Sequence, residues 1–415
     1  MKMRDETVHV LGAGIVGICT ALSLLEKGFD VVLIDRNDPA SGASHGNAGV
    51  ISPWSCIPQS MPGLWKQVPK WLIDPNGPLS LRWSYAPRMI PWLRRFLNSS
   101  APDSLAKIAA GMNALNRPNV EIYRQHLKGT GHEELLRDSL YVHAFRNAAD
   151  ADLGKLPWRI RAEYGVPMER IEGGDLQDIE PEISNEYKAA ILIKDQARAI
   201  DPGAIGRVLL DKAKGMGAHF RKVEIQALRP TEAGWMIDTS HGAIEAQKLV
   251  IAAGAWSKRI LEPLGYKMPL EAERGYHLMF GNPGITLNNS IMDVDGKFVA
   301  SSMIDGVRCA GTAEFAGLET PPNYARAFVF KKLAKRLFPR LDTSRVTPWM
   351  GTRPSFPDSL PMIGEMPHHP GLFAAFGHCH YGLGMAPNTG RVVAGLVARE
   401  PTNIDLRPYS ITRFS

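Results

Sequence analysis

The sequence has 415 residues, with 48 Lys and Arg against 42 Asp and Glu, and a formal net charge of +6 at pH 7. Hydrophobic residues make up 44% and charged residues 22%, which is typical of a globular enzyme and excludes a disordered or fibrous chain. Lys and Arg form no dense run, so we expect no nucleic-acid partner. This length predicts more than one domain.

Cysteine usage and hydropathy indicate the compartment. Cys19, Cys56, Cys309 and Cys379 are scattered and form no C-x-x-C pair, which favours a reducing environment. The N-terminus does not resemble a secretory signal, and no run of 18 apolar residues predicts a transmembrane helix. We therefore expect a cytoplasmic protein.

The N-terminal region predicts a βαβ unit. Residues 8–11 are mostly apolar and short enough for a buried strand, and residues 15–27 carry apolar side chains at helical spacing. Gly28 ends this helix, and residues 31–34 form a second apolar strand. About 30 residues are the length expected of the motif.

Three glycines join the first strand to the helix in the pattern G-x-G-x-x-G. Gly12 permits the tight turn, Gly14 lets the backbone approach a pyrophosphate, and Gly17 lets helix and strand pack closely. The helix N-terminus favours phosphate, and the carboxylate that closes the second strand can bind ribose hydroxyls. We expect a dinucleotide to contact Gly12, Gly14, Ile15, Val16, Gly17, Asp35 and Arg36.

A loop of small residues follows the second strand and permits close approach to a flat ligand. It resembles the flavin-contacting loop of the D-amino-acid oxidase/dehydrogenase superfamily. Its Ser-x-x-Asn-Ala-Gly portion is similar to that of the bacterial D-amino-acid dehydrogenases of the small-subunit type. The resemblance implies that FAD is the cofactor. The residues concerned are Ser44, His45, Asn47, Ala48 and Gly49.

Later segments return to the same domain. A helix is predicted over 202–214, a strand over 217–225, a hairpin over 234–246 and an apolar strand over 248–257. The resemblance implies that this last strand passes under FAD near Gly254, and we also expect Val223 to contact FAD. Residues 140–200 and 269–315 are predicted to be rich in β-strands. Residues 326–338 are predicted to form a basic amphipathic helix on an outer face.

The fold class that follows is α/β (α+β overall), with a Rossmann-type FAD-binding domain of discontinuous segments and an antiparallel-sheet substrate domain. We assign residues 1–90, 200–265 and 345–415 to the first and residues 91–199 and 266–344 to the second.

Residues 53–97 combine tryptophan, basic residues and proline. Trp with Lys and Arg is typical of membrane interfaces, so peripheral contact with the inner face of the cytoplasmic membrane, or with a quinone, is one interpretation. A lid whose tryptophans pack on the protein is the other. The residues concerned are Trp54, Trp65, Trp71, Trp83, Trp92, Lys66, Lys70, Arg82, Arg88, Arg94 and Arg95.

Residues 351–364 resemble the Gly-x-Arg-Pro … Pro-x-Ile-Gly stretch of the same superfamily. There the arginine binds the substrate carboxylate, which implies this role for Arg353, next to Gly351. A planar guanidinium suits the role because it pairs with a carboxylate through two hydrogen bonds. A structural arginine in a turn is the alternative.

Residues 372–390 predict a strand, a glycine-rich turn and a helix over 389–397. The resemblance implies that the turn lies against the isoalloxazine ring, through Gly382, Leu383, Gly384 and Met385. The spacing of His378, Cys379 and His380 does not suit a metal, so no metal site is predicted. Cys379 does not match the cysteine of covalent flavoenzymes, so we expect non-covalent FAD.

The predicted chemistry is hydride transfer from the substrate Cα to flavin N5, in which positioning supplies much of the catalysis. The substrate amine must lose a proton, so a nearby acceptor helps. The candidate acceptors are Tyr276, His277, His45, His380 and Tyr381.

We expect a D-amino-acid dehydrogenase, with D-proline or hydroxy-D-proline as a suggested substrate. No second nucleotide motif exists, which favours a quinone or another electron-transfer partner over a nicotinamide. An O₂-using amine oxidase of the glycine or sarcosine type is a second hypothesis. A third is an FAD-binding subunit of a larger dehydrogenase complex.

Overall fold

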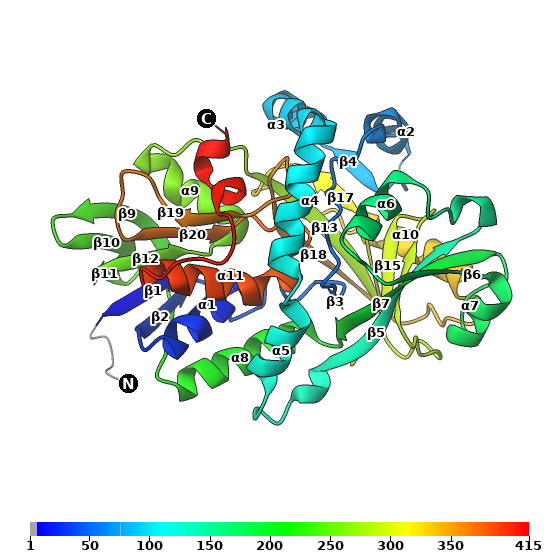
Figure 1. The fold of residues 1–415 in the computed structure, drawn as a ribbon, viewed down its shortest axis with the longest axis horizontal. Coiled ribbons are helices and arrows are strands. Elements are labelled where there is room, and N and C mark those ends of the chain that lie inside the picture. Colours follow the sequence, from blue (N-terminus) through cyan, green and yellow to red (C-terminus); the bar gives the residue numbers. More distant parts are fainter. Residues whose placement is uncertain (1–5, 75, 415) are drawn as a thin grey trace.

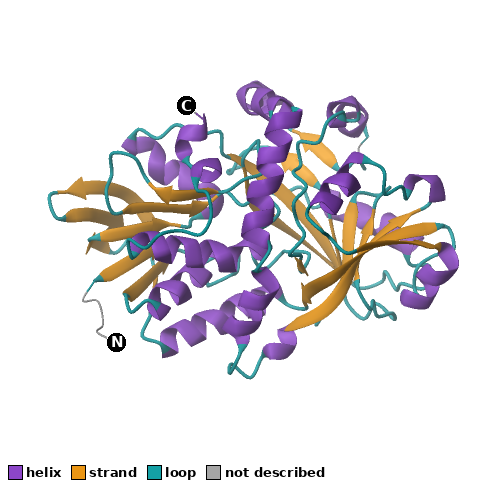
Figure 2. Ribbon diagram, in the orientation of Figure 1, coloured by secondary structure: helices purple, strands orange, loops and turns teal. Residues whose placement is uncertain are grey.

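The computed structural model describes residues 6–74 and 76–414. Figure 1 shows a sheet with α1 and α11 at one end of the molecule, a larger sheet at the other end, and helix α4 standing between them. Figure 2 separates the same elements by type, with helices along the middle and strands at both ends.

A six-stranded sheet has the order β19-β20-β12-β1-β2-β8 and is parallel except at its β19 edge. This arrangement is expected of a Rossmann-type domain. The strand predicted over 248–257 ends earlier than expected, at Ile251, where a single-turn helix follows. The strands of the six-stranded sheet are β1 (Thr7–Leu11), β2 (Asp30–Asp35), β8 (His219–Lys222), β12 (Lys248–Ile251), β19 (Met362–Glu365) and β20 (Leu372–Phe376).

Alternate side chains of this sheet enter two different cores. Val10 and Leu33 pack against helices on one face, whereas Leu11 and Ile34 pack on the other face against a three-stranded antiparallel sheet. The alternation follows from the two-residue repeat of a strand. The helices are α1 (Ile15–Glu26), α8 (Pro202–Gly215) and α11 (Gly382–Val397), and the small sheet is β9 (Ile225–Thr231), β10 (Gly234–Thr239) and β11 (Gly242–Ala246).

The second large sheet is mostly antiparallel and runs β3-β7-β5-β14-β15-β16-β13-β17-β4, with β18 paired to β13 and β6 paired to β7. Most of its strands come from the two β-rich regions predicted above, whereas β3, β4 and β18 lie outside them. The strands of this sheet are β3 (Val50–Ile51), β4 (Leu79–Leu81), β5 (Leu136–Phe145), β6 (Met168–Glu172), β7 (Ala189–Ala199), β13 (Glu271–Phe280), β14 (Ser290–Asp293), β15 (Phe298–Met303), β16 (Gly306–Ala310), β17 (Ala313–Phe315) and β18 (Val346–Ser355). The predicted domain boundaries stay a prediction.

The other helices are α2 (Val68–Ile73), α3 (Ala86–Asn98), α4 (Pro102–Asn116), α5 (Asn119–Leu127), α6 (Leu156–Glu163), α7 (Gly173–Ile179), α9 (Ser257–Leu261) and α10 (Ala325–Leu337). Single-turn 3-10 helices are η1 (Leu64–Lys66), η2 (Trp83–Tyr85), η3 (Glu133–Leu135), η4 (Ala148–Asp150), η5 (Gly254–Trp256), η6 (Glu262–Leu264), η7 (Arg407–Tyr409) and η8 (Ile411–Phe414). Helix α10 matches the predicted basic helix but buries one face, including Phe330 and Leu337.

Helix α11 begins at Gly382, seven residues before the predicted start at Thr389. Glycines and Pro387 indicated a loop, because proline cannot donate the helical hydrogen bond to the residue four positions earlier. The structure supplies another donor: the Tyr123 hydroxyl donates to the Leu383 carbonyl oxygen at 2.7 Å. The helix therefore tolerates Pro387, and its N-terminus lies closer to the end of β20.

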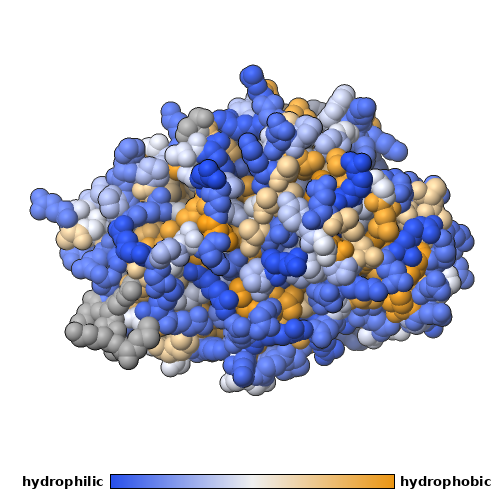
Figure 3. All heavy atoms as spheres, viewed as in Figure 1, coloured by the Kyte–Doolittle hydropathy of each residue, from blue (hydrophilic) through white to orange (hydrophobic). Residues whose placement is uncertain are grey.

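The Trp-rich segment 53–97 is only partly packed. Trp54 and Trp92 are buried, whereas Trp65 and Trp83 are 58% and 75% exposed. Exposed Ile90 lies on α3, the helix near the top of Figure 1. In Figure 3 apolar side chains form separate patches among polar ones on the face shown. No helix in the described part of the chain combines the length and hydropathy needed to cross a membrane.

Candidate active site

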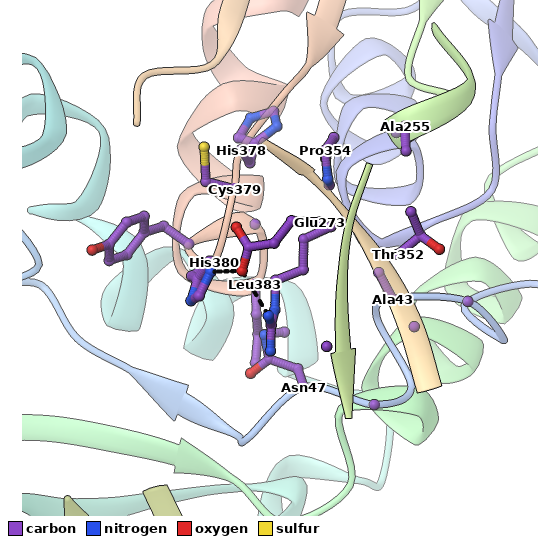
Figure 4. Close-up of a pocket in the computed structure, with 18 of the residues that line it drawn as sticks. Ala43, Asn47, Ala255, Glu273, Thr352, Pro354, His378, Cys379, His380 and Leu383 are labelled. Carbon is purple, nitrogen blue, oxygen red and sulfur yellow. Dashed lines mark hydrogen bonds and ion pairs between the residues drawn. The ribbon is translucent and has the colours of Figure 1, made fainter. Parts of the chain in front are cut away.

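One cavity of about 1040 Å³ runs from the β1–α1 turn to the inner strands β13 and β18. Its walls come from segments that are far apart in the sequence, including the 44–48 loop, residues 64–96 and residues 375–384. Figure 4 shows part of this wall, where Glu273 and His380 point toward each other.

The β1–α1 turn is closed tightly against β12. Gly12 has φ +117°, and a Cβ there would lie 2.4 Å from the Ala252 carbonyl oxygen. A Cβ on Gly17 would lie 1.9 Å from the Gly12 carbonyl oxygen. No other residue type fits these two positions without moving the backbone, which is the packing that a dinucleotide turn requires.

The N-terminus of α1 opens into the cavity. A Cβ on Gly14 would meet nothing nearer than the Ser44 hydroxyl oxygen, at 3.6 Å, so the backbone here is open to a ligand. The Ile15 backbone N–H donates to that hydroxyl at 3.0 Å. The loop is thereby fixed to the helix N-terminus, where partial positive charge favours phosphate.

Asp35 ends β2 at the edge of the cavity. Its carboxylate accepts hydrogen bonds from the Ala13 and Asn37 backbone N–H groups at 2.8 and 2.9 Å, which fixes its orientation. The Arg36 guanidinium lies 4.7 Å from the centre of the Trp256 ring. Together these side chains form a flat, polar end of the cavity that suits a ribose and a base.

Arg308 fixes the small-residue loop from β16. Its Nη1 donates to the carbonyl oxygens of His45 and Asn47, at 2.8 and 2.6 Å. Burial lowers the pKa of Arg308 to about 10, so the guanidinium keeps its charge at neutral pH. The sequence pattern did not reveal Arg308, because it is 261 residues away from Asn47 in the chain.

Arg353 and Glu273 lie opposite each other on the paired strands β18 and β13. Arg353 Nη1 donates to Glu273 Oε1 at 2.8 Å and to the Thr312 carbonyl oxygen at 3.1 Å. Nη2 has no hydrogen-bond partner among the described residues. A Cβ on Gly275 would lie 2.2 Å from the Arg353 guanidinium carbon, so glycine is needed for Arg353 to lie across β13.

Glu273 also holds His380. Its Oε1 is 2.5 Å from His380 Nε2, and its Oε2 accepts from the Ser355 hydroxyl at 2.7 Å. Burial raises the pKa of Glu273, but His380 and Arg353 outweigh burial and lower that pKa to about 2. Glu273 is therefore ionised at neutral pH, and in a neutral His380 ring this bond puts the proton on Nε2 and leaves Nδ1 as an acceptor.

The other candidate proton acceptors are less free. The Tyr276 hydroxyl donates to Glu314 at 2.6 Å and accepts from the Asn323 N–H, and burial raises its pKa to about 12. The Tyr381 hydroxyl donates to the Ile57 carbonyl oxygen at 2.8 Å. His380 is thus the candidate with an available ring nitrogen.

Two more histidines lie behind the wall. His277 stacks on Trp349 with ring centres 4.9 Å apart, and burial lowers its pKa to about 3. His45 also lies outside the cavity, 6.0 Å from Trp349 and edge-on to it. Trp349 itself lines the cavity, and the sequence pattern gave no indication of it.

Most predicted contact residues lie on the cavity wall. Those that line it are Gly12, Gly14, Ile15, Val16, Asp35, Arg36, Ser44, Asn47, Ala48, Gly254, Tyr276, Gly351, Arg353, His380, Tyr381, Gly382, Leu383 and Gly384. Those that do not are Gly17, His45, Gly49, Val223 and Met385. The Val223 N–H instead extends strand pairing by donating to the Asp35 carbonyl oxygen.

A further part of the cavity is lined by apolar side chains of the Trp-rich segment. They lie on or beside η1, α2, β4 and α3. The residues are Leu64, Val68, Trp71, Leu72, Leu79, Leu81, Met89, Trp92, Leu93 and Phe96. This part suits an apolar molecule better than an amino acid.

The sequence and the fold both match known proteins. Residues 7–396 match the family model described as FAD dependent oxidoreductase. A D-amino-acid oxidase of Bradyrhizobium diazoefficiens is 38% identical over 417 residues, covering 98% of both chains. A D-amino acid dehydrogenase of Paramagnetospirillum magneticum is 32% identical, covering 98% of this chain and 99% of the relative.

Solved structures share the fold. Glycine oxidase from Geobacillus kaustophilus has a TM-score of 0.74 at 23% identity, covering 98% of this chain and 99% of the other. L-proline dehydrogenase from P. horikoshii has a TM-score of 0.76 at 19% identity, covering 100% of this chain and 98% of the other.

Proposed function

Because this chain belongs to the FAD-dependent oxidoreductase family, whose cofactor is FAD, we propose that it dehydrogenates a D-amino acid. When bound, FAD accepts a hydride equivalent from the substrate Cα at its N5 atom. The substrate amine loses a proton, and water hydrolyses the released imine to a 2-oxo acid and ammonia. A cyclic amine would give a cyclic imine.

The residues present fit FAD. The open backbone at Gly14 and the helix N-terminus beside it would hold the pyrophosphate. Asp35 would bind ribose hydroxyls with the lone pairs that its two backbone contacts leave free. The N-terminus of α11, at Gly382 and Leu383, lies on the same cavity and would favour negative charge on the flavin ring.

The observation that carries the proposal is Arg353, held on the cavity wall with Nη2 free of any partner within residues 6–74 and 76–414. A guanidinium so fixed would take the substrate α-carboxylate and orient Cα. His380 would accept the amine proton at Nδ1, while Glu273 fixes the ring through Nε2. The Glu273 carboxylate thus holds both Arg353 and His380, which fixes their positions relative to each other.

Aromatic side chains support a ring-shaped substrate as one member of the class. Tyr141, Trp349 and Tyr381 line the cavity together with Arg353. Flat apolar walls can enclose a ring such as that of D-proline or hydroxy-D-proline.

We propose a quinone as the electron acceptor. The apolar part of the cavity under α2 and α3 supports it, because a quinone ring on an apolar tail would fit there. Exposed Trp65 and Trp83, with Lys and Arg around them and Asp74 as the single acid in residues 60–97, support contact with an anionic membrane surface.

An O₂-using oxidase is the second candidate. It is favoured by the 38% identical relative that is named D-amino-acid oxidase. Under air, hydrogen peroxide formation at the rate of substrate loss would identify an oxidase. Fast turnover only with a quinone analogue would identify a dehydrogenase.

The proposal is tested by anaerobic mixing of the yellow holoenzyme with D- and L-amino acids, proline isomers and N-methyl amino acids. Bleaching of the flavin by a D-amino acid is the expected result. Failure of every substrate in the panel would refute the proposal. It would instead support an FAD-binding subunit that needs the rest of a larger complex.

A further inference from the structure

Arg161 is a cation on the cavity wall with almost no polar partner. It lies in the last turn of α6 and lines the cavity beside Tyr141 and Tyr381. Within the described part of the chain it makes a single hydrogen bond, from Nη1 to the Pro157 carbonyl oxygen, which is long at 3.4 Å. Its Nε is buried without a partner, and it forms no ion pair within residues 6–74 and 76–414.

The other arginines at the cavity are differently placed. Arg353 is paired with the Glu273 carboxylate, which fixes its guanidinium. Arg36 and Arg259 also line the cavity, and each is paired with a carboxylate, Glu224 and Glu319 respectively. Among the described residues, Arg161 is the one arginine of the cavity wall without a carboxylate partner.

Two contacts stabilise Arg161 without using those donors. The guanidinium lies 4.8 Å from the centre of the Trp158 ring, and the C-terminus of α6 carries partial negative charge. Neither contact satisfies Nε or Nη2. The buried Nε donor without a partner is costly, and an anion bound at the guanidinium would reduce that cost.

Arg161 and Arg353 both belong to the wall of the same cavity. Tyr381, which lines the cavity together with Arg161, is the neighbour of His380 in the chain. Their rings are 6.4 Å apart. His380 in turn shares the Glu273 carboxylate with Arg353. A substrate whose α-carboxylate rests on Arg353 would therefore extend along this wall toward Arg161.

We propose that Arg161 binds an anionic group on the substrate side chain, so that the cavity favours D-amino acids with a second carboxylate, such as D-glutamate or D-aspartate. The inference rests on the proposed function and names its substrate class. Tyr141 and Tyr381 then form the walls between the two guanidinium groups, and a plain ring such as D-proline leaves Arg161 unpaired.

The test compares each acid with its amide, because D-glutamate and D-glutamine differ little except in charge. Anaerobic flavin reduction gives kcat/KM for D-glutamate, D-glutamine and D-proline with the wild type, Arg161→Gln and Arg161→Lys. Arg159→Gln is the matched control, since Arg159 is on the same helix but exposed and away from the cavity.

The wild type is expected to favour D-glutamate over D-glutamine at least tenfold, about the value of one charge-assisted hydrogen bond. Arg161→Gln is expected to remove that ratio, Arg161→Lys to keep part of it, and Arg159→Gln to keep all of it. An unchanged ratio in Arg161→Gln would overturn the inference. An equal loss for all three substrates would also overturn it, because Arg161 would then serve the α-carboxylate or the fold.

Binding without turnover separates this inference from the proposed function. Glutarate and its monoamide have no amine to oxidise, and their dissociation constants follow from shifts in flavin absorbance. Tighter binding of glutarate than of its monoamide, if it depends on Arg161, supports the inference. It does so even if no amino acid reduces the flavin, because the absence of flavin reduction would refute only the proposed function. Equal binding of the two probes to the wild type would overturn the inference.

Discussion

Replacing Glu273 with Gln removes one negative charge from the site and changes its shape little. The carboxylate is 3% exposed and contacts Arg353, His380 and Ser355. In the variant, Arg353 loses its counter-ion and His380 loses the charge that fixes its ring. The variant should therefore be less stable and should orient the substrate poorly.

The size of the stability effect follows from the pKa of Glu273. Burial raises this pKa, but His380 and Arg353 hold it at about 2, against an ordinary 4.5. A lowering of about 2.5 pH units corresponds to about 3 kcal/mol of unfolding free energy. Because the folded-state pKa is the lower one, this stabilisation is complete above pH 4.5 and is lost as the pH falls toward 2.

Urea unfolding of the holoenzyme between pH 3 and 8 measures this contribution of Glu273 to the free energy of unfolding. The wild type should exceed Glu273→Gln by about 3 kcal/mol above pH 6, and by about half of that at pH 3. Glu262→Gln, at an exposed position, is the control and should change stability by less than about 0.5 kcal/mol. A difference between wild type and Glu273→Gln that does not vary with pH would refute the ionised Glu273.

Three further substitutions test other parts of the site. Arg353→Leu should lower kcat/KM for amino acids by at least about 100-fold while the flavin spectrum is kept; normal turnover would exclude Arg353 as the carboxylate site. Gly17→Val should purify largely without flavin absorbance, because even a Cβ there would lie 1.9 Å from the Gly12 carbonyl oxygen. Arg308→Met removes two hydrogen bonds to the 45–47 loop and should weaken FAD binding about tenfold, measured by flavin fluorescence on dilution.

The nucleotide-binding end of the site was predictable because its information is local. A strand, three glycines at fixed spacing and a helix lie within one short stretch, and Gly12 and Gly17 have the close backbone contacts that the pattern implies. The hairpin over 234–246 and the helix from Pro202 were equally clear in the sequence. Such elements are set by neighbours in the chain.

The inner end of the site depends on which residues of neighbouring strands face each other, and this register is not evident from the sequence. Glu273 faces Arg353 because β13 pairs with β18 over ten positions, and 80 residues separate the two. Arg161 reaches the cavity from a helix that carries no motif. Helix α11 starts early because Tyr123, from α5, satisfies a carbonyl group that Pro387 leaves free. In each case the decisive partner is distant in the chain.

The central claim is that FAD in this cavity oxidises a D-amino acid held by Arg353. The most direct measurement is anaerobic stopped-flow mixing of the holoenzyme with the D and L forms of one amino acid, followed at the flavin absorbance band. We expect that the D form bleaches the flavin, that the L form does not, and that Arg353→Leu retains FAD but is not bleached. A flavin that no D-amino acid reduces, or equal bleaching of Arg353→Leu and wild type, would contradict it.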